Sequence, residues 1–268
     1  MTFNVLLKPL SDVIVPPFTS KVTRTAFSVL TGTVPSFSRR ASFSVLFRGL
    51  SPLFRTIKRG EDASRVKLIV KQGEELWARC SLLIKEDFQL PQPHAFLEFG
   101  GARFEARVMG VNISEINNMS LEYEKFEVNF LTPTLLSVPG RGVFLRERGI
   151  KRRYKLIPDL PLALALLVYD LKHIGVPVDT TPMRIFRWAY KAIAELDYSI
   201  KPVTVLYTIK EGKPAVERGF IGKVVYELLD PNSKYAEVFY FLLAYMEKFG
   251  LGKSRSIGFG HVNIRQLS

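Results

Sequence analysis

The order of strands and helices expected in the second half of the chain limits the fold most strongly. Residues 126–131 alternate between apolar and polar side chains, which predicts a half-buried strand, and Thr132-Pro133 is expected to end it because proline donates no ladder hydrogen bond. Apolar residues at helical spacing predict helices at 160–174 and 181–196. The second of these helices would begin with Thr181 as its N-cap and Pro182 in its first turn.

The remaining segments complete a known order of elements. Residues 203–209 and 216–229 are rich in strand-forming side chains, and residues 210–214 between them have a hairpin signature. Asn232 or Ser233 is expected to cap a helix that stops at Gly250, and residues 257–264 predict a closing strand. The order β, α, β, β, α, β is that of the ferredoxin-like arrangement, in which helices cover one face of a four-stranded antiparallel sheet.

The first half fits the same arrangement less completely. Strands are expected at 3–8 and 42–47, and between them a helix at 20–30, which Thr19 or Ser20 would cap and Gly32 would end. Further β-like segments follow at 66–70, 76–84, 95–99 and 103–111, and no second helix is evident. We therefore predict an α+β chain of two tandem ferredoxin-like domains, residues 1–120 and 121–268, of which the first is modified.

Positive charge is concentrated in one part of the sequence. The formal net charge is +13, and no acidic residue occurs between Val13 and Gly60. That stretch holds these basic residues: Lys21, Arg24, Arg39, Arg40, Arg48, Arg55, Lys58 and Arg59. A charge-rich surface of the thermophile type would contain many acidic and many basic residues together. Because only basic residues are numerous here, the pattern favours a polyanion such as nucleic acid as the partner.

Metal, membrane and secretory functions find little support in the composition. The single cysteine, Cys80, and the histidines His94, His173 and His261 are far apart in the sequence, so we expect no metal site and no cofactor. No apolar run reaches the roughly 18 residues of a membrane span. The start of the chain is rich in arginine and serine, as transit peptides are, but its alternating apolar residues favour a folded strand. We expect a cytoplasmic protein without membrane contact.

A glycine-rich basic segment, residues 250–260, lies between the last expected helix and the last expected strand. It contains Gly-Lys-Ser, but position 247 is Glu247 where a nucleotide-hydrolase loop needs glycine, and the order of strand and helix around it is reversed. A tight turn could account for Gly250 and Gly252, whereas Gly258 and Gly260 exceed what one turn needs. The count therefore favours a surface on which backbone amides and basic side chains hold an RNA backbone.

The segment Gly-Lys-Ser-Arg-Ser-Ile-Gly-Phe-Gly-His-Val at residues 252–262, set in this order of elements, resembles the RAMP superfamily. Within it, the chain resembles the sixth CRISPR-associated family, the endoribonucleases that cut CRISPR repeat transcripts into guide RNAs. Residues 16–21, 128–137 and 217–222 are similar to segments of crenarchaeal members, and the resemblance is loose between about residues 39 and 120. It implies two ferredoxin-like domains, CRISPR repeat RNA in a basic cleft and cleavage without a metal ion.

The resemblance also implies a set of site residues. Many members carry a histidine after the first helix, and here neither histidine nor tyrosine occurs before His94. By comparison with relatives lacking that histidine, the expected catalytic residues are Lys21, Arg24, Arg40, Arg218 and Arg255. The residues expected to bind RNA are Arg39, Arg48, Gly252, Lys253, Ser254, Ser256 and Gly258. The arginines would hold phosphate and Lys21 could exchange a proton, so cleavage is expected to be slow.

Three functions agree with these observations. The first is a repeat-specific endoribonuclease, and the second is a non-cleaving RNA-binding subunit of a CRISPR effector complex with the same fold and loop. The third is a basic scaffold for another acidic partner, whose binding would be insensitive to salt, unlike phosphate contacts. The repeat sequence, the scissile bond and the formation of a homodimer are left open. The three histidines are expected to be structural or to face solvent.

Overall fold

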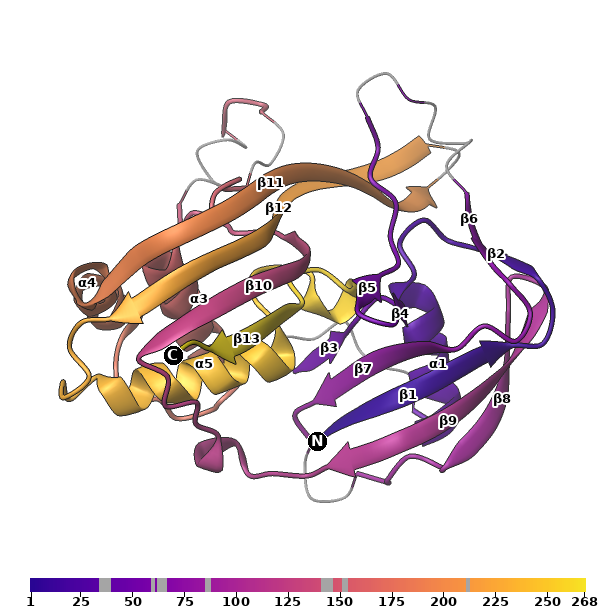
Figure 1. Ribbon diagram of the computed structural model, residues 1–268, viewed down its shortest axis with the longest axis horizontal. Helices are drawn as coiled ribbons and strands as arrows, with labels where there is room; N and C mark the ends of the chain where they lie inside the picture. Colours follow the sequence, from indigo (N-terminus) through magenta and orange to yellow (C-terminus); the bar gives the residue numbers. More distant parts are fainter. Residues whose placement is uncertain are drawn as a thin grey trace. The chain divides into compact units, whose positions relative to one another are not determined.

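The computed structural model describes residues 1–33, 40–58, 61, 67–84, 88–140, 147–150, 154–210 and 213–268 (Figure 1). The chain forms two compact units. Unit 1 consists of Met1–Ile113, Thr204–Glu217 and Arg255–Gly258, and unit 2 of Ser114–Val203, Arg218–Ser254 and Phe259–Ser268. The boundary expected after residue 120 is near the change of unit after Ile113. The sequence did not predict that Thr204–Glu217 and Arg255–Gly258 belong to unit 1.

Unit 1 is built on an antiparallel sheet in the order β5-β4-β7-β1-β9-β8. Its members are β1 (Thr2–Pro9), β4 (Phe47–Arg48), β5 (Ser51–Pro52), β7 (Leu76–Leu82), β8 (His94–Phe99) and β9 (Ala102–Asn112). β3 (Ala41–Phe43) also pairs with β7, and β2 (Val13–Val15) pairs with β6 (Leu68–Val70) in a separate ribbon. The strands expected around residues 3–8, 66–70, 76–84, 95–99 and 103–111 are confirmed.

Helix α1 (Ser20–Thr31) covers one face of this sheet because its apolar residues recur at helical spacing. Val22, Phe27 and Leu30 are buried, and the ring of Phe27 stacks on that of Phe3 with centroids 5.9 Å apart. The helix ends as predicted at Gly32, which has a left-handed φ of 65°. Alternate residues of β1 point to this helix, so the core of unit 1 lies between α1 and the sheet.

Unit 1 departs from the regular ferredoxin-like pattern in two ways. β7 lies beside β1, where the closing strand would be, yet it precedes the β8–β9 hairpin in the sequence. No second α-helix occurs among the described residues of this unit. The strand expected at 42–47 is also interrupted, because the backbone N–H of Ser44 donates to Arg79 and Leu46 accepts from Leu53 before β4 begins. The first domain is therefore a modified copy, as predicted.

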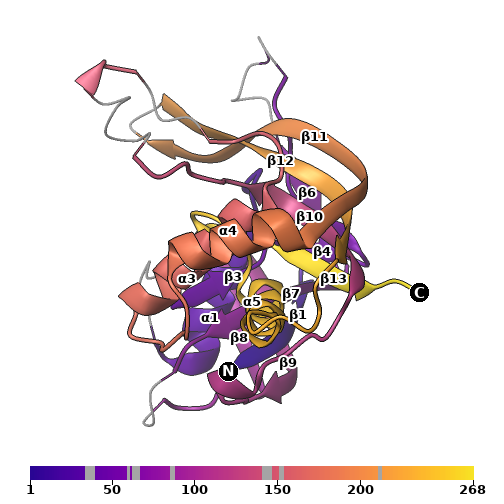
Figure 2. The ribbon, with the colours of Figure 1, turned by 90° about the vertical axis from the view of Figure 1, so that its left-hand side faces the viewer.

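Unit 2 has the regular arrangement. Its antiparallel sheet runs β11-β12-β10-β13, formed by β10 (Lys125–Thr134), β11 (Ile193–Lys210), β12 (Lys213–Leu228) and β13 (Val262–Gln266), although the far part of the β11–β12 hairpin belongs to unit 1. The helices are α3 (Leu160–His173), α4 (Pro182–Ala192) and α5 (Ala236–Phe249) (Figures 1 and 2). Phe126 lies in the core between Tyr226 and Phe239, with ring centroids 5.6 and 5.8 Å away. This is the predicted ferredoxin-like fold.

Two strand predictions in unit 2 are wrong at their ends. β10 continues through Pro133 to Thr134, because a register shift after Phe130 removes the need for a proline N–H, and the Pro133 carbonyl accepts from Gly260 at 3.0 Å. The closing strand begins at Val262, because Arg255–Ile257 form a short 3₁₀ helix, η3.

Two helix predictions also need correction. α4 begins as expected, with Thr181 accepting from the Arg184 N–H at 3.3 Å, but it ends at Ala192 because Ile193 is extended and enters β11. α5 begins at Ala236, after a turn in which Ser233 accepts backbone hydrogen bonds, so neither Asn232 nor Ser233 is its N-cap. Another short 3₁₀ helix, Ile116–Asn118, precedes β10. None of the helices described is both long and apolar enough to cross a membrane.

Candidate functional site

The start of α1 is rich in positive charge. It holds Lys21, Arg24 follows one turn later, and the first turn contains no acidic residue. The N-terminal end of a helix already has a partial positive charge from its unpaired amides. Thr19 does not cap these amides, because its hydroxyl donates to the Leu53 carbonyl and accepts from the Leu46 N–H, both at 2.8 Å. The start of α1 therefore attracts anions.

The far end of the β11–β12 hairpin contacts this start within unit 1. The ammonium of Lys21 donates to the Oγ1 atom of Thr208 at 3.0 Å. The backbone of residues 56–57 holds the hairpin in place, since Thr56 bridges to Val205 and the Ile57 N–H donates to the Thr204 carbonyl at 2.8 Å. Lys21 is thus positioned by a hydroxyl, which carries no charge to offset that of the ammonium.

Arg255–Gly258, at the far end of the glycine-rich segment, reaches the same place. The hydroxyl of Ser20 donates to the Ile257 carbonyl at 2.7 Å. A Cβ atom added at Gly258 would lie 2.7 Å from that of Ser20 and 2.9 Å from the ring of Phe18, so only glycine fits. Arg255 is buried, with 5% of its surface exposed. Lys21, Arg24 and Arg255 are therefore placed within one unit, around the start of α1.

The glycines of residues 250–260 are needed by the fold, so the interpretation of their number as an anion-binding feature is corrected. Gly250, Gly252, Gly258 and Gly260 all have positive φ. A Cβ at Gly252 would lie 2.7 Å from the Leu135 carbonyl oxygen, and one at Gly260 would lie 1.7 Å from that of Leu251. Positive φ at all four positions, with close packing at Gly252, Gly258 and Gly260, accounts for these glycines. Their number is no evidence for an anion-binding surface.

Many backbone amides of this segment are used inside the chain. These N–H groups donate to backbone carbonyls: Gly250, Leu251, Lys253, Gly258, Phe259 and Gly260. The expected contacts of Lys253, Ser254 and Ser256 with RNA therefore depend chiefly on side chains. Lys253 is exposed, Ser256 is half-buried, and half-buried Ser254 has a left-handed φ of 65°.

The other predicted cations occupy different surroundings. Arg24 is half-buried, and this burial lowers the pKa of its guanidinium from the ordinary value, although arginine stays protonated. Arg40 is half-buried next to β3, and Arg218 is exposed on β12 in unit 2. Arg48 is exposed and forms an ion pair with Glu74. Arg39 lies outside the described residues.

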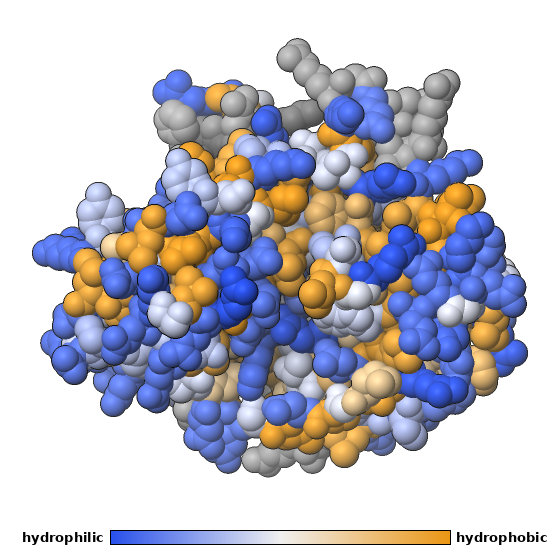
Figure 3. Space-filling model, viewed as in Figure 1, coloured by the Kyte–Doolittle hydropathy of each residue, from blue (hydrophilic) through white to orange (hydrophobic). Residues whose placement is uncertain are grey.

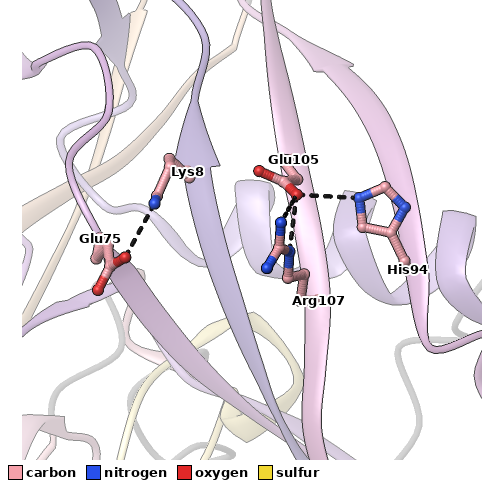
Figure 4. A network of polar contacts seen from close by, with 5 residues as sticks. All are labelled: Lys8, Glu75, His94, Glu105 and Arg107. Carbon is pink, nitrogen blue, oxygen red and sulfur yellow. Dashed lines mark hydrogen bonds and ion pairs between the residues drawn. The ribbon is translucent and has the colours of Figure 1, made fainter.

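The histidines lie where structural roles explain them. His94 is exposed on β8 and contacts Glu105 at 3.2 Å, while Arg107 approaches the same carboxylate (Figure 4). These contacts hold the pKa of Glu105 below its usual range, and the hydrogen bond with Arg107 has the largest effect. His173 stacks on Tyr169 in the last turn of α3. His261 is buried, and its N–H donates to the Thr132 hydroxyl at 2.8 Å.

The start of α1 can bind phosphate and stabilise negative charge, because it combines cations, hydroxyls and helix amides. Within the part of the chain that the structure describes, no three histidine, cysteine, aspartate or glutamate side chains gather in a way that could hold a metal ion. Sequence reasoning missed Ser20 and Thr208 as members of this site. No signal could have revealed Thr208, because an ordinary strand residue far away in the sequence contacts Lys21 only in the fold.

Family models match both halves of the chain. The model of the Cas6 N-terminal domain matches residues 1–114, and that of the CRISPR-associated endoribonuclease Cas6 matches residues 128–262. The chain belongs to the Cas6 family. The resemblance noted from the sequence is therefore confirmed, and with it membership of a family of RNA-cleaving enzymes.

Similar Cas6 proteins are known in sequence and in structure. A CRISPR-associated endoribonuclease Cas6 of Saccharolobus solfataricus is 23% identical, over 98% of this chain and 94% of that protein. A second Cas6 of the same organism is 25% identical over 60% of this chain and 59% of that protein. A product complex of Thermus thermophilus Cas6 matches with a TM-score of 0.64 at 16% identity, over 99% of this chain and 100% of the other. The last likeness supports the fold of tandem ferredoxin-like domains.

Proposed function

We propose that this Cas6 protein binds CRISPR repeat RNA and cuts precursor transcripts into guide RNAs. The observation that carries the proposal is the gathering of cations at the start of α1, where Lys21 and Arg24 lie beside Arg255–Gly258 within unit 1. An RNA phosphate is the kind of anion that such a cluster attracts. The substrate class follows from family membership and from similar proteins, one of which was solved as a product complex.

The proposed reaction is a transesterification within the RNA. The ribose 2′-oxygen forms a bond to the adjacent phosphorus as its proton passes to a water molecule, and the bond from phosphorus to the 5′-oxygen breaks as that oxygen takes a proton from the Lys21 ammonium, which water then reprotonates. The products are a 2′,3′-cyclic phosphate and a 5′-hydroxyl. This route needs no metal ion, because the nucleophile belongs to the substrate.

Lys21 and Arg24 are proposed to act directly on the scissile phosphate. The ammonium of Lys21 has three donors, of which one is directed to Thr208, so it can donate to a phosphate oxygen and give a proton to the leaving 5′-oxygen. Arg24 would hold a non-bridging oxygen and offset charge in the phosphorane. Arg255, which is buried, would stabilise that charge through the protein interior while it holds Arg255–Gly258 in place. Arg40 and Arg218 are proposed as further catalytic cations.

A wider set of residues is proposed to bind the rest of the repeat. It consists of Arg39, Arg48, Gly252, Lys253, Ser254, Ser256 and Gly258. Lys253 is the strongest member, since its side chain is exposed. Arg48 would have to exchange its ion pair with Glu74 for a phosphate, so we expect it to contribute less.

One observation favours a second candidate, a Cas6 protein that binds RNA in an effector complex without cutting it. Neither histidine nor tyrosine occurs before His94, and Tyr207 neighbours Thr208 on β11 and so points to the opposite face of the strand. These observations place neither a histidine nor a tyrosine base beside Lys21 among the described residues. Cleavage by cations alone would be slow.

Incubation of labelled repeat RNA with the protein in EDTA tests both candidates. The endonuclease produces a single cut with a cyclic phosphate end, and a 2′-deoxy substitution at the cut nucleotide abolishes it. RNA that is shifted in a native gel but stays intact over many hours would rule out cleavage and support the binding subunit.

A further inference from the structure

Helix α4 of unit 2 presents an outer face that combines positive charge with apolar side chains. Its inner face packs into the unit through Ile185, Ala189 and Ala192, which are buried. The exposed residues of the helix are Met183, Arg184, Arg187, Tyr190 and Lys191. Figure 3 shows apolar patches beside hydrophilic side chains at the left, where α4 lies in Figure 1.

The exposed residues of α4 form two adjacent rows. Successive residues of a helix are about 100° apart around its axis, so Arg184, Arg187 and Lys191 fall within about 60° of one another. Met183 and Tyr190 fall within about the next 60°. Arg187 and Lys191 are four residues apart, about 6 Å along the axis. A row of cations therefore runs beside a row that contains an aromatic ring.

The stability of the helix does not explain these cations. α4 contains no acidic residue, and no ion pair joins Arg184, Arg187 or Lys191 to an acid in the part of the chain that the structure describes. Lys191 lies in the last turn, where a positive charge is favourable. Arg184 lies in the first turn, where the partial positive charge of the helix makes a cation unfavourable. The cations therefore match an anion outside the helix.

The aromatic ring of this face is held in place. Tyr190 is 74% exposed, and its ring stacks on that of half-buried Phe186 with centroids 6.3 Å apart and an interplanar angle of 25°. On the side of α5, Trp188 packs against Phe239 with ring centroids 5.8 Å apart. Tyr190 thus offers an exposed ring on an anchored helix, and such rings stack on nucleotide bases whatever the base.

We propose that α4 is a second RNA site, which holds a single-stranded segment of the transcript outside the repeat and does not read its sequence. Phosphates contact Arg184, Arg187 and Lys191, and a base stacks on Tyr190. An acidic peptide matches the cations alone, whereas RNA matches both the cations and the ring. The inference rests on the proposed function for the origin of this RNA, but all its residues belong to unit 2.

Binding of labelled RNAs tests the cations. The RNAs are the repeat alone, the repeat extended at either end by about ten uridines, and the uridine strand alone. One of the extensions should raise affinity about tenfold. Arg187→Gln together with Lys191→Gln should remove most of this gain and leave the affinity for the unextended repeat unchanged. Lys71→Gln together with Lys201→Gln is the matched control, because it removes two charges from exposed lysines outside α4 and should retain the gain.

Replacement of Tyr190 tests the stacking. Tyr190→Leu should lower the gain from the extension about fivefold, and Tyr190→Phe, which keeps the ring, should retain it. Equal gains for the leucine and phenylalanine variants would overturn the stacked arrangement and with it the proposed site.

Four further results would overturn the proposal. They are no gain from either extension, an equal loss in the lysine control, displacement of the uridine strand by oligoglutamate at the same charge concentration, and a changed sedimentation mass of the α4 variants with unchanged RNA affinity. The third would indicate an acidic protein as the partner. A repeat that does not bind at all would instead refute the proposed function, and uridine-strand binding that depends on Arg187 and Lys191 would still support the α4 site.

Discussion

Lys21 illustrates how a residue can be ordered and still be ready for an anion. Its ammonium is held by the Thr208 hydroxyl at 3.0 Å, and no acidic residue occurs from Val13 to Gly60. A hydroxyl fixes the direction of the ammonium and does not neutralise it. A carboxylate in the same place would compete with the RNA phosphate.

Replacement of Lys21 by methionine should therefore lower the cleavage rate much more than the affinity for RNA. We expect a loss of about 100-fold in the single-turnover rate at saturating protein, as for other removed donors that act on transition-state charge. Lys8→Met is the control, because Lys8 is a surface lysine whose ammonium pairs with Glu75 at 2.9 Å (Figure 4). Equal rates for the two variants would remove Lys21 from the reaction.

Gly258 shows a second residue-scale constraint, in which the absence of a side chain allows close packing. Gly258→Ala should destabilise the protein by about 2–4 kcal/mol, since it combines a left-handed conformation, at φ 95°, with a clash against Ser20 and Phe18. Gly73→Ala, at φ 72° with open space around it, should cost only about 1 kcal/mol. Urea unfolding of both variants measures the difference. Similar losses would show that Arg255–Gly258 can move away from α1.

At the scale of elements, sequence patterns located most strands and helices but misplaced several ends. The apolar spacing that predicts a helix to residue 196 continues past Ala192, yet Ile193 is β-branched and gains a ladder with β12. Likewise, Pro133 ends a strand only if its N–H is needed, and the register shift in β10 makes it unnecessary. Both errors arise because long-range pairing decides the end of an element, and local patterns do not contain that information.

α3 offers a test of an element whose start is fixed locally. Asp159 accepts from the Leu162 N–H at 2.9 Å and from the Lys155 ammonium at 2.5 Å. Asp159→Ala should lower the free energy of unfolding by about 1–2 kcal/mol, because it removes the cap and the ion pair. Asp159→Asn retains a capping oxygen and should lower the free energy of unfolding by clearly less. Thermal unfolding of the two variants separates the cap from the charge, and an equal loss would assign the effect to the ion pair.

At the scale of the molecule, the candidate site could be proposed from residue types, but its assembly could not be predicted. The resemblance indicated Lys21, Arg24 and Arg255 from the sequence alone, and the one-sign charge pattern also covers the first two. The placement of Arg255–Gly258 and of the β11–β12 hairpin end in unit 1 was not foreseeable, because local sequence patterns do not reveal contacts between distant segments. The burial of Arg255 was missed for the same reason, since a basic residue in a glycine-rich segment is ordinarily exposed.

The net charge of +13 leads to a prediction about the whole protein. If about four phosphates are neutralised on binding repeat RNA, affinity should fall about 50-fold between roughly 50 and 200 mM salt, since each contact releases counterions. Titrations of labelled RNA at several salt concentrations give the slope of the logarithm of affinity against the logarithm of salt concentration. Lys253→Ala should make this slope shallower by the contribution of about one phosphate contact, whereas Lys253→Arg should preserve it. An affinity that ignores salt would mean that acidic groups other than phosphates are bound, and it would favour a basic scaffold over an RNA-binding protein.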